Sequence, residues 1–533
     1  NQMLNNNKSH QMYTPFRHYT FLKTAVLSLA LLASCKEKPH EKTSQSVAAI
    51  DSTPPNVIII YADDLGWNGV HAYGNKQVET PHIDALAAEG VRFTQAYATA
   101  PICSPSRAGL LTGRYQQRFG FEFLVPSEIE THITDANLKE AIKQATAARK
   151  EVAEKVDENT YKQVHKGLPT TEITFANVFK DAGYATTIIG KWHLGEQKEF
   201  QPQNRGFENH LGFLSWGSIY TSVANKDVLT RSYHFHLPQS KSTKREGSLV
   251  LVRNGKEEVD TSYITDRFAD EAVRFIDNHK AKPFLLYLPL TTPHDPFQAK
   301  KSDFDAITTE KDTVKRIYLA MIKSLDDAVG RITAKLKETG LDQNTIIIFG
   351  SDNGGASYTK QMSNAPLKGG KLSHFEGGIR VPLIIKYPKG VPAGKVYERP
   401  VSNLDYFPTI VAAAGLKLPN SKSYDGVNLL PYINSADTSR PHETLFWRNG
   451  YSKAIRKGDW KLYVNDRAKK TLLYNLAADI SESKDLSKAH PDKLKELQEA
   501  LRTWESELPQ PSWPSKRSVP LLELEDASYY FPI

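Results

Sequence analysis

The sequence contains very little cysteine, and this scarcity narrows the classes of protein it can belong to. Only two of its 533 residues are cysteine, Cys35 and Cys103. A disulfide-stapled scaffold and a cysteine-rich zinc module are therefore excluded, because both need several cysteines. The chain also lacks a block of Lys and Arg. Its net charge of +8, from 68 Lys and Arg against 60 Asp and Glu, therefore indicates a mixed surface and no nucleic-acid partner. With 40% hydrophobic residues, the chain has globular composition and enough length for two domains.

No apolar run is long enough for a comfortable membrane span, but a short one near the beginning predicts a secretory signal. Residues 21–35, FLKTAVLSLALLASC, follow the basic Arg17. Their ending, LASC, resembles a bacterial lipobox, in which Cys35 is lipidated and becomes the first mature residue. An ordinary signal peptide with a chance cysteine is the alternative. We expect residues 1–34 to be removed and residues 35–55 to form a polar tether. The protein would then be an exported bacterial lipoprotein of the periplasm or outer membrane, or the cell surface, held to the membrane only through its lipid anchor.

Four apolar runs end in polar residues. They cover residues 56–64, 185–193, 283–294 and 345–355. Because they are apolar throughout and do not alternate, they predict strands buried on both faces of a mainly parallel sheet. Ligands of such sheets bind beyond the carboxyl ends of the strands. We therefore expect the four polar clusters to meet at one edge of one sheet.

The segments between these runs have the pattern of crossover helices. Residues 80–90, 171–183 and 308–340 carry helix start or stop signals or an apolar stripe at helical spacing, and residues 381–388 predict a further core strand. The predicted fold class is α/β, with a large, mainly parallel sheet sandwiched by helices.

The polar residues at the strand ends have the chemistry of a metal-assisted anion site. Three carboxylates and an amide are hard ligands suited to Ca²⁺ or Mg²⁺; they belong to Asp63, Asp64, Asp352 and Asn353. Positive or hydrogen-donating groups suited to an anionic ester belong to Arg107, Lys191, His193, His294 and Lys371. Taken singly, each of these residues has an ordinary structural alternative: an Asp can cap a helix, Asp-Asn-Gly can form a turn, and a loop histidine can lie at the surface. Their occurrence at corresponding strand ends favours the functional reading.

Cys103 precedes a predicted short helix. Ser104 is a good N-cap, Pro105 suits the first helical position and Gly113 ends the helix, so Cys103 would lie at its positive end. A thiolate nucleophile is the direct inference, and a small buried apolar residue is the alternative. A ring of carboxylates around a hard cation, however, suits oxygen chemistry better than sulfur.

Cys103 begins the stretch CSPSRAGLLTGR, which resembles the full signature of the type I sulfatases, members of the alkaline phosphatase superfamily. The resemblance extends over residues 54–430 through further motifs in family order: ADDLGW, TPHIDALAAEGVRF, GKWHLG, NRGF, TPHDPF, SDNGG and LKGGKLSHFEGGIRVP. Asn68, Val70 and Lys368 depart from residues common in many relatives, but none of them is a proposed ligand.

The resemblance implies a complete catalytic site. In that family a formylglycine-generating enzyme oxidises the cysteine, and the hydrated aldehyde is the nucleophile. The positions that would hold Ca²⁺, or Mg²⁺ in its place, are Asp63, Asp64, Cys103, Asp352 and Asn353. The implied catalytic positions are Arg107 and Lys191, which orient the hydrate, His193, the base for sulfate release, and His294 with Lys371, which bind sulfate and protonate the leaving oxygen.

The resemblance and the patterning together predict the domain organisation. We expect a catalytic domain over residues 56–430 and a smaller C-terminal α+β domain over residues 431–533. The C-terminal part would contain antiparallel strands joined by a turn at Asn449-Gly450. An inserted polar stretch, residues 128–166, would be either a surface excursion or part of the substrate cleft.

The leading functional hypothesis is removal of sulfate from a sulfated oligosaccharide or polysaccharide. Ulvan, carrageenan, fucan and glycosaminoglycan remain open as its source. Two alternatives are kept. One is a formylglycine-dependent phosphodiester or phosphonate monoester hydrolase of the same superfamily. The other is a glycan-binding lipoprotein that lacks catalysis.

Overall fold

A computed structural model describes residues 53–125, 150–217, 219–231, 244–435, 439–524 and 528–533, with residues 140, 143, 147 and 526. Residues from Thr53 onward form one compact unit. The predicted signal and most of the predicted tether, including Cys35, lie outside the described residues. Within the described ranges, no helix has both the length and the apolar character that a membrane crossing requires.

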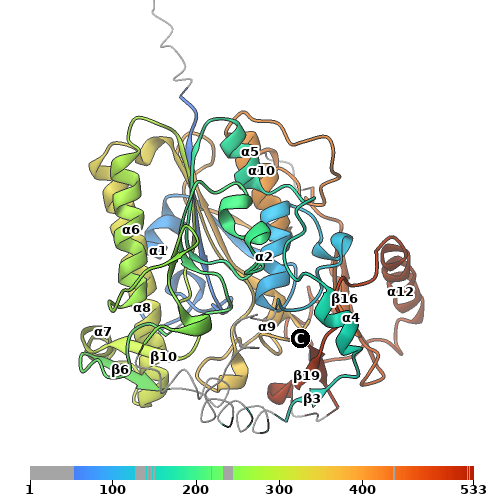
Figure 1. The fold of residues 1–533 in the computed structure, drawn as a ribbon. Helices are drawn as coiled ribbons and strands as arrows, with labels where there is room; N and C mark the ends of the chain where they lie inside the picture. Colours follow the sequence, from blue (N-terminus) through green and yellow to red (C-terminus); the bar gives the residue numbers. More distant parts are fainter. Residues whose placement is uncertain are drawn as a thin grey trace, which may run out of the picture. The chain divides into compact units, whose positions relative to one another are not determined.

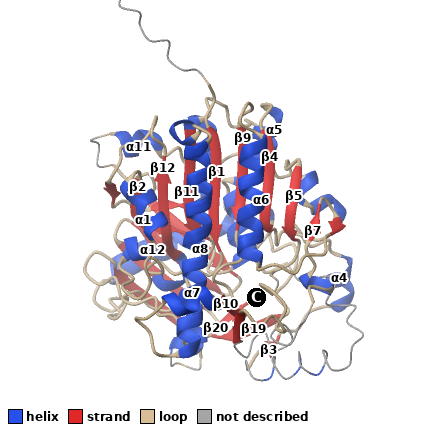
Figure 2. Ribbon diagram, turned by 90° about the vertical axis from the view of Figure 1, so that its left-hand side faces the viewer, coloured by secondary structure: helices blue, strands red, loops and turns tan. Residues whose placement is uncertain are grey.

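The largest sheet is mixed and mainly parallel at its centre. Its strands follow the order β13 (Lys395–Tyr397), β2 (Val91–Tyr97), β12 (Arg380–Lys386), β11 (Thr345–Ser351), β1 (Asn56–Ala62), β9 (Phe284–Pro289), β4 (Ala185–Lys191), β5 (Asn209–Phe213), β7 (Val252–Arg253) and β8 (Lys256–Glu257), with β14 (Val401–Ser402) also beside β2. Strands β11, β1, β9, β4 and β5 pair in parallel, whereas β12 is antiparallel to β11. The four predicted strands are therefore adjacent, as Figure 2 shows.

Both faces of this sheet are covered by helices, which explains the uninterrupted apolar runs. In β1, Ile58 and Ile60 pack into one core, and Val57 and Ile59 pack into the other. The first core also contains side chains from α1 (Pro81–Ala88), α6 (Ile264–Asn278) and α8 (Thr313–Glu338). The second contains side chains from α2 (Cys103–Thr112), α5 (Phe175–Asp181) and α10 (Tyr406–Ala413). Figure 1 shows the two layers on either side of the strands. The predicted α/β sandwich is confirmed.

The C-terminal part contains a separate antiparallel sheet. Its strands are β15 (Thr444–Asn449), β16 (Ser452–Lys457), β17 (Trp460–Asn465) and β18 (Lys470–Asn475), and α12 (Pro491–Ser506) packs against β16 and β17. The first turn differs from its prediction: Asn449 pairs with Ser452, so the turn is centred on Gly450 and Tyr451. Gly450 takes the positive φ of 54° that the first central position of such a turn requires.

Smaller elements complete the described chain. Strands β10 (Phe297–Lys300) and β6 (Val228–Arg231) form a pair, and β20 (Tyr530–Pro532), β19 (Arg517–Pro520) and β3 (Val152–Ala153) form another small sheet. The remaining helices are α4 (Glu158–Gln163), α7 (Lys301–Ala306), α9 (Glu376–Ile379) and α11 (Leu430–Asn434). Of the predicted insertion, residues 128–166, the structure describes residues 140, 143, 147 and 150–166, and its end forms β3 and α4. Strand β3 pairs with β19, so this end is tied to the C-terminal tail.

Candidate active site

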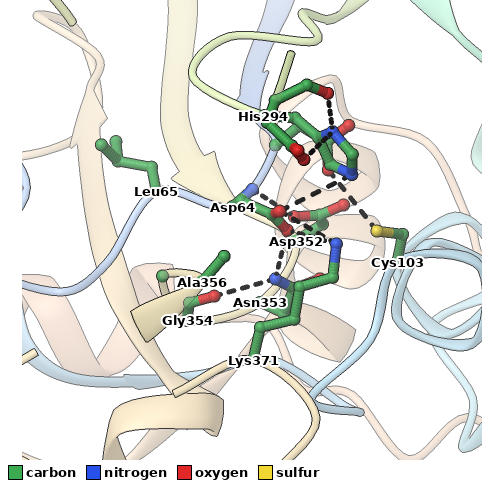
Figure 3. Close-up of polar contacts among 12 residues, drawn as sticks. Asp64, Leu65, Cys103, His294, Asp352, Asn353, Gly354, Ala356 and Lys371 are labelled. Carbon is green, nitrogen blue, oxygen red and sulfur yellow. Dashed lines mark hydrogen bonds and ion pairs between the residues drawn. The ribbon is translucent and has the colours of Figure 1, made fainter. Parts of the chain in front are cut away.

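The carboxyl ends of the parallel strands carry the predicted polar residues to one place. Asp63 and Asp64 follow β1, Asp352 and Asn353 follow β11, and Lys191 ends β4. Figure 3 shows the side chains of Asp64, Asp352, His294, Lys371 and Cys103 turned toward one another. All nine residues predicted to hold a metal or an anion, together with Cys103, are buried in the structure.

Three buried carboxylates are matched by three buried cations. The Lys191 ammonium lies 2.6 Å from Asp63, the Lys371 ammonium 2.8 Å from Asp64, and the Arg107 guanidinium 2.7 Å from Asp352. Arg107 donates to the same Asp352 oxygen through Nε, at 3.1 Å, and Nη2. Because isolated buried charges are costly, this pairing reduces the cost of burying six ionisable groups in one site.

The charge pattern also sets the protonation states of these groups. Burial alone would lower the pKa of Lys371, but the Asp64 carboxylate raises it well above its ordinary value. Likewise, burial would raise the pKa of Asp63, but Lys191 lowers it overall. Burial and the neighbouring charge of Asp63 raise the pKa of Asp352. The site therefore keeps Lys371 positive and Asp63 negative at neutral pH.

Cys103 is the first residue of α2, and its thiol faces the acids. Sγ lies 3.5 Å from Oδ1 of Asp63, and the residue is 2% exposed. The prediction that Ser104 caps the helix is wrong. The extended Ile102 is the N-cap, and Ser104 Oγ instead accepts a hydrogen bond from the Val125 amide at 3.1 Å. Burial raises the pKa of the Cys103 thiol, so an unmodified thiol would be protonated and weakly nucleophilic.

Two histidines flank the charged cluster. His294 Nδ1 donates to the backbone carbonyl of Asp295 at 2.6 Å, and its Nε2 lies 3.6 Å from Asp64. His193 is 3% exposed, and its Nδ1 has no hydrogen-bond partner among the described residues. Burial, followed by the charges of Lys191 and Arg107, lowers the pKa of His193 well below its ordinary value. His193 is consequently neutral at physiological pH.

The residues fit a hard divalent cation. One ligand atom from each of Asp63, Asp64, Cys103 and His294 lies within 4.8 Å of the others. Among Asp, Glu, His and Cys residues, this group differs from the predicted metal set in two: it includes His294, and it does not include Asp352. Oδ1 of Asn353 is buried and accepts no hydrogen bond from any described residue. Buried oxygens usually have a hydrogen-bond partner, so this one is available to bind a cation. Carboxylate and amide oxygens are ligands that Ca²⁺ and Mg²⁺ prefer.

Three non-glycine residues of this site have a left-handed backbone conformation. Asp64, His193 and Leu372 have φ angles of 64°, 58° and 76°, in the left-handed region that non-glycine residues seldom adopt. Such conformations cost about 1–3 kcal/mol each and persist where the surrounding structure requires them. Of these residues, Asp64 is a proposed metal ligand, His193 is a proposed base and Leu372 is the neighbour of Lys371.

The sequence reasoning did not single out Trp216, which lies against His294. The two ring centres are 6.1 Å apart, and the indole is partly exposed. Trp216 follows β5, the next parallel strand beyond β4. The rule that ligands bind beyond the carboxyl ends of parallel strands would have indicated Trp216 if β5 had been predicted. That strand was missed because it is short and contains Asn, His and Gly.

Two family models and several known proteins match this chain. The family model described as "Sulfatase" matches residues 55–416, and "N-sulphoglucosamine sulphohydrolase, C-terminal" matches residues 370–507. The chain is 31% identical to the N-acetylgalactosamine-6-sulfatase of Rattus norvegicus over 426 residues, covering 78% of this chain and 73% of the relative. It is also 31% identical to the steryl-sulfatase of Mus musculus over 471 residues, covering 76% and 69%.

Two solved structures are also similar to this chain over most of their length. Ps i-CgsB, in complex with k-i-k-neocarrahexaose, is similar at 35% identity with a TM-score of 0.72, covering 86% of this chain and 95% of that chain. The PsFucS1 sulfatase from Pseudoalteromonas sp. is similar at 25% identity with a TM-score of 0.65, covering 85% and 90%. The predicted resemblance is thus confirmed: the chain belongs to the sulfatase family and is a hydrolase of sulfuric ester bonds.

Proposed function

We propose that this enzyme removes sulfate from a sulfated carbohydrate, using a formylglycine made from Cys103 and a Ca²⁺ ion held beside it. The observation that carries this proposal is the pairing of three buried carboxylates with Lys191, Lys371 and Arg107 around Cys103. The paired charges cancel, so a divalent cation bound among them would make the site positive. A positive, dry pocket favours an anionic ester whose oxygens gain charge during reaction.

The burial of Cys103 supports its conversion. As a protonated thiol in a dry environment it would be a poor nucleophile. The hydrated aldehyde of formylglycine would supply an oxygen nucleophile at this position, and the metal would neutralise charge on the bound sulfate. The proposed metal residues are Asp63, Asp64, Asp352 and Asn353 with residue 103; Mg²⁺ is the alternative ion.

The remaining residues would bind the ester and move protons. Lys371 is held 2.8 Å from Asp64 and stays charged, which suits it to binding a sulfate oxygen. His294 Nε2 lies 3.6 Å from the same Asp64 carboxylate, and His294 would donate a proton to the leaving oxygen. His193 is neutral and would accept a proton during sulfate release. Arg107 and Lys191 would hold the nucleophile in place.

A carbohydrate substrate is supported by two features. The structure neighbours include a protein solved with k-i-k-neocarrahexaose, at 35% identity over most of both chains. In this chain, the partly exposed indole of Trp216 lies beside His294, where it would stack against an apolar sugar face. A sulfated galactan oligosaccharide of the carrageenan type is therefore the first substrate to test, ahead of ulvan, fucan and glycosaminoglycan fragments.

The cellular context is proposed from the sequence alone. The lipobox at Cys35 supports an exported lipoprotein of the periplasm or outer membrane. A formylglycine-generating enzyme would act on it during maturation. The proposed division into a catalytic domain over residues 56–430 and a C-terminal domain over residues 431–533 places the separate sheet β15–β18 in the second part.

The test is release of inorganic sulfate by protein produced together with a formylglycine-generating enzyme. Peptide mass spectrometry first establishes the aldehyde at position 103. Ion chromatography then measures the sulfate released from carrageenan, ulvan, fucan and glycosaminoglycan oligosaccharides, and the free phosphonate formed from a phosphonate monoester. Sulfate from the oligosaccharides, absent with Cys103→Ala, is the expected result. Phosphonate cleavage without sulfate release would instead favour the related phosphonate hydrolase activity. No release by aldehyde-bearing protein across all four classes of glycan would overturn the proposed substrate class.

A further inference from the structure

Three charged side chains with no exposed surface meet where α9 contacts the C-terminal sheet. The Lys461 ammonium, on β17, lies 2.9 Å from a carboxylate oxygen of Glu376 and 2.9 Å from one of Glu482. Glu376 lies on α9, and Glu482 lies between β18 and α12. None of the three belongs to the proposed active site.

Further hydrogen bonds fix the orientation of this trio. The Glu376 amide donates to Glu482 at 2.6 Å, and the Tyr97 hydroxyl donates to the Glu376 carboxylate at 2.7 Å. Arg380 approaches the same carboxylate at 3.5 Å. Buried ion pairs give little net stability over apolar residues of the same size, but breaking one is costly. The trio is therefore better explained by the position it imposes on α9 than by stability.

The segment that contains Glu376 contacts the C-terminal sheet through three consecutive residues. His374 makes hydrogen bonds to Ser452 at 2.9 Å and Asn449 at 3.1 Å. The Phe375 ring stacks on Tyr463 with ring centres 4.4 Å apart. Glu376 completes the contact through Lys461. We call residues 367–379 the Lys371 segment.

The other side of the Lys371 segment contacts the active site. The Lys371 amide donates to the Gly355 carbonyl at 3.0 Å, and the Leu372 amide donates to the Pro101 carbonyl at 2.8 Å. The Gly354 amide, next to Asn353, donates to the Gly378 carbonyl at 2.9 Å. Pro101 lies two residues before Cys103. The segment is therefore clamped between the C-terminal sheet and the residues that bear the chemistry.

Close packing makes this segment stiff. A Cβ atom on Gly378 would lie 1.9 Å from the Ser373 carbonyl oxygen, and one on Gly377 would lie 2.3 Å from that of Gly369. Both approaches are too short for any side chain. Because the two halves of the segment pack backbone against backbone, a displacement at Glu376 is carried to Lys371.

We propose that Lys461 is a positioning residue that acts through Glu376 to hold the Lys371 segment in place. The segment in turn holds the Lys371 ammonium where it would bind a sulfate oxygen. The expected effect on sulfate binding rests on the proposed function. The expected effect on the position of the Lys371 segment does not. The proposal assigns the C-terminal sheet a role in catalysis without any contact between Lys461 and substrate.

The experiment uses two variants of the mature, aldehyde-bearing protein and one matched control. Lys461→Met removes the cation but leaves two buried carboxylates facing each other. The double variant Lys461→Met/Glu482→Gln removes one charge of each sign and so limits that repulsion. The control, Arg267→Met, removes a partly buried cation on α6 that likewise pairs with several carboxylates, Glu258, Asp260 and Glu271, at 2.7–3.0 Å. None of those partners contacts the Lys371 segment.

The first measurement is amide hydrogen exchange, which needs no substrate. In the double variant we expect peptides covering residues 367–379 to exchange at least tenfold faster, while peptides from β1 keep their wild-type rates. The control should leave the segment unchanged relative to β1. Equal exchange of the segment in the double variant and the wild-type protein would overturn the proposal.

The second measurement is the inhibition constant of inorganic sulfate and the KM for the oligosaccharide that the wild-type enzyme hydrolyses. Displacement of Lys371 should raise both about tenfold or more in the double variant. A purely structural role would lower the active fraction, and thus kcat, with KM and the inhibition constant unchanged, and would refute the proposal. If the wild-type protein released no sulfate, the proposed function would fail, and hydrogen exchange alone would decide the role of Lys461.

Discussion

Replacing Glu482 with glutamine should change how stability depends on pH, because its carboxylic acid is buried beside a second carboxylate. Burial and repulsion by Glu376 outweigh the attraction of Lys461 and raise the pKa of Glu482 from 4.5 to about 7. Between these values the folded protein binds more protons than the unfolded chain. Stability conferred by this group is therefore present below pH 4.5 and lost as the pH rises toward 7.

The size of the effect follows from the shift. A pKa difference of one unit corresponds to about 1.4 kcal/mol, so ionising Glu482 costs the folded state at most about 3 kcal/mol. Glutamine carries no charge at any pH and escapes this loss. Relative to the wild-type protein, Glu482→Gln should thus gain up to about 3 kcal/mol in its free energy of unfolding between pH 5 and pH 8.

Urea denaturation of both proteins at pH 5 and pH 8, followed by tryptophan fluorescence, measures this difference. Ionisable groups that do not interact with Glu482 cancel because they behave alike in both proteins. A stability difference that stays the same within about 0.5 kcal/mol at both pH values would show that Glu482 has no raised pKa. A relative loss for the variant at pH 8 would show that Lys461 keeps Glu482 ionised throughout, contrary to our reasoning.

Three further predictions concern the active site. Cys103→Ala should reduce sulfate release by about 10³-fold or more while leaving the urea midpoint close to that of the wild-type protein, since only one small buried side-chain atom is lost; substantial activity in this variant would contradict the nucleophile assignment. Lys371→Met should lower kcat/KM about 10- to 150-fold, equivalent to the roughly 1.5–3 kcal/mol of a charge-assisted hydrogen bond, and steady-state kinetics that show no loss would exclude Lys371 from sulfate binding. Removal of divalent cations with EDTA should abolish sulfate release, and added Ca²⁺ should restore it more fully than Mg²⁺; full activity in EDTA would rule out the proposed metal requirement.

The sheet and the active site were predictable from sequence because both depend on local patterns. Uninterrupted apolar runs such as residues 56–62 indicate burial on both faces, and parallel pairing then brings the residues that follow each run to one edge. The same reasoning placed Asp63 near Asp352, although 289 residues separate them. Motifs in family order supplied the remaining proposed catalytic positions.

What escaped prediction depends on contacts between distant segments. Ser104 is a residue type that often caps helices, but its hydroxyl accepts a hydrogen bond from the Val125 amide, and the helix starts two residues earlier than predicted. Glu376, Lys461 and Glu482 were not singled out. No local pattern distinguishes a buried Lys on a strand from one facing solvent, and their partners lie 85 and 106 residues away from Glu376 in the chain.

The burial of Cys103 also constrains when the protein can be matured. With 2% of its surface exposed, this side chain is out of reach of a second enzyme once the chain has folded. Ile102, its neighbour, packs in the same cluster as Val519, Leu521 and Phe531 near the chain's end. If Cys103 is oxidised as proposed, the oxidation must come before this cluster closes. A molecule that folds first would be stable and correctly shaped, yet permanently without its nucleophile, so the speed of folding sets the yield of active enzyme.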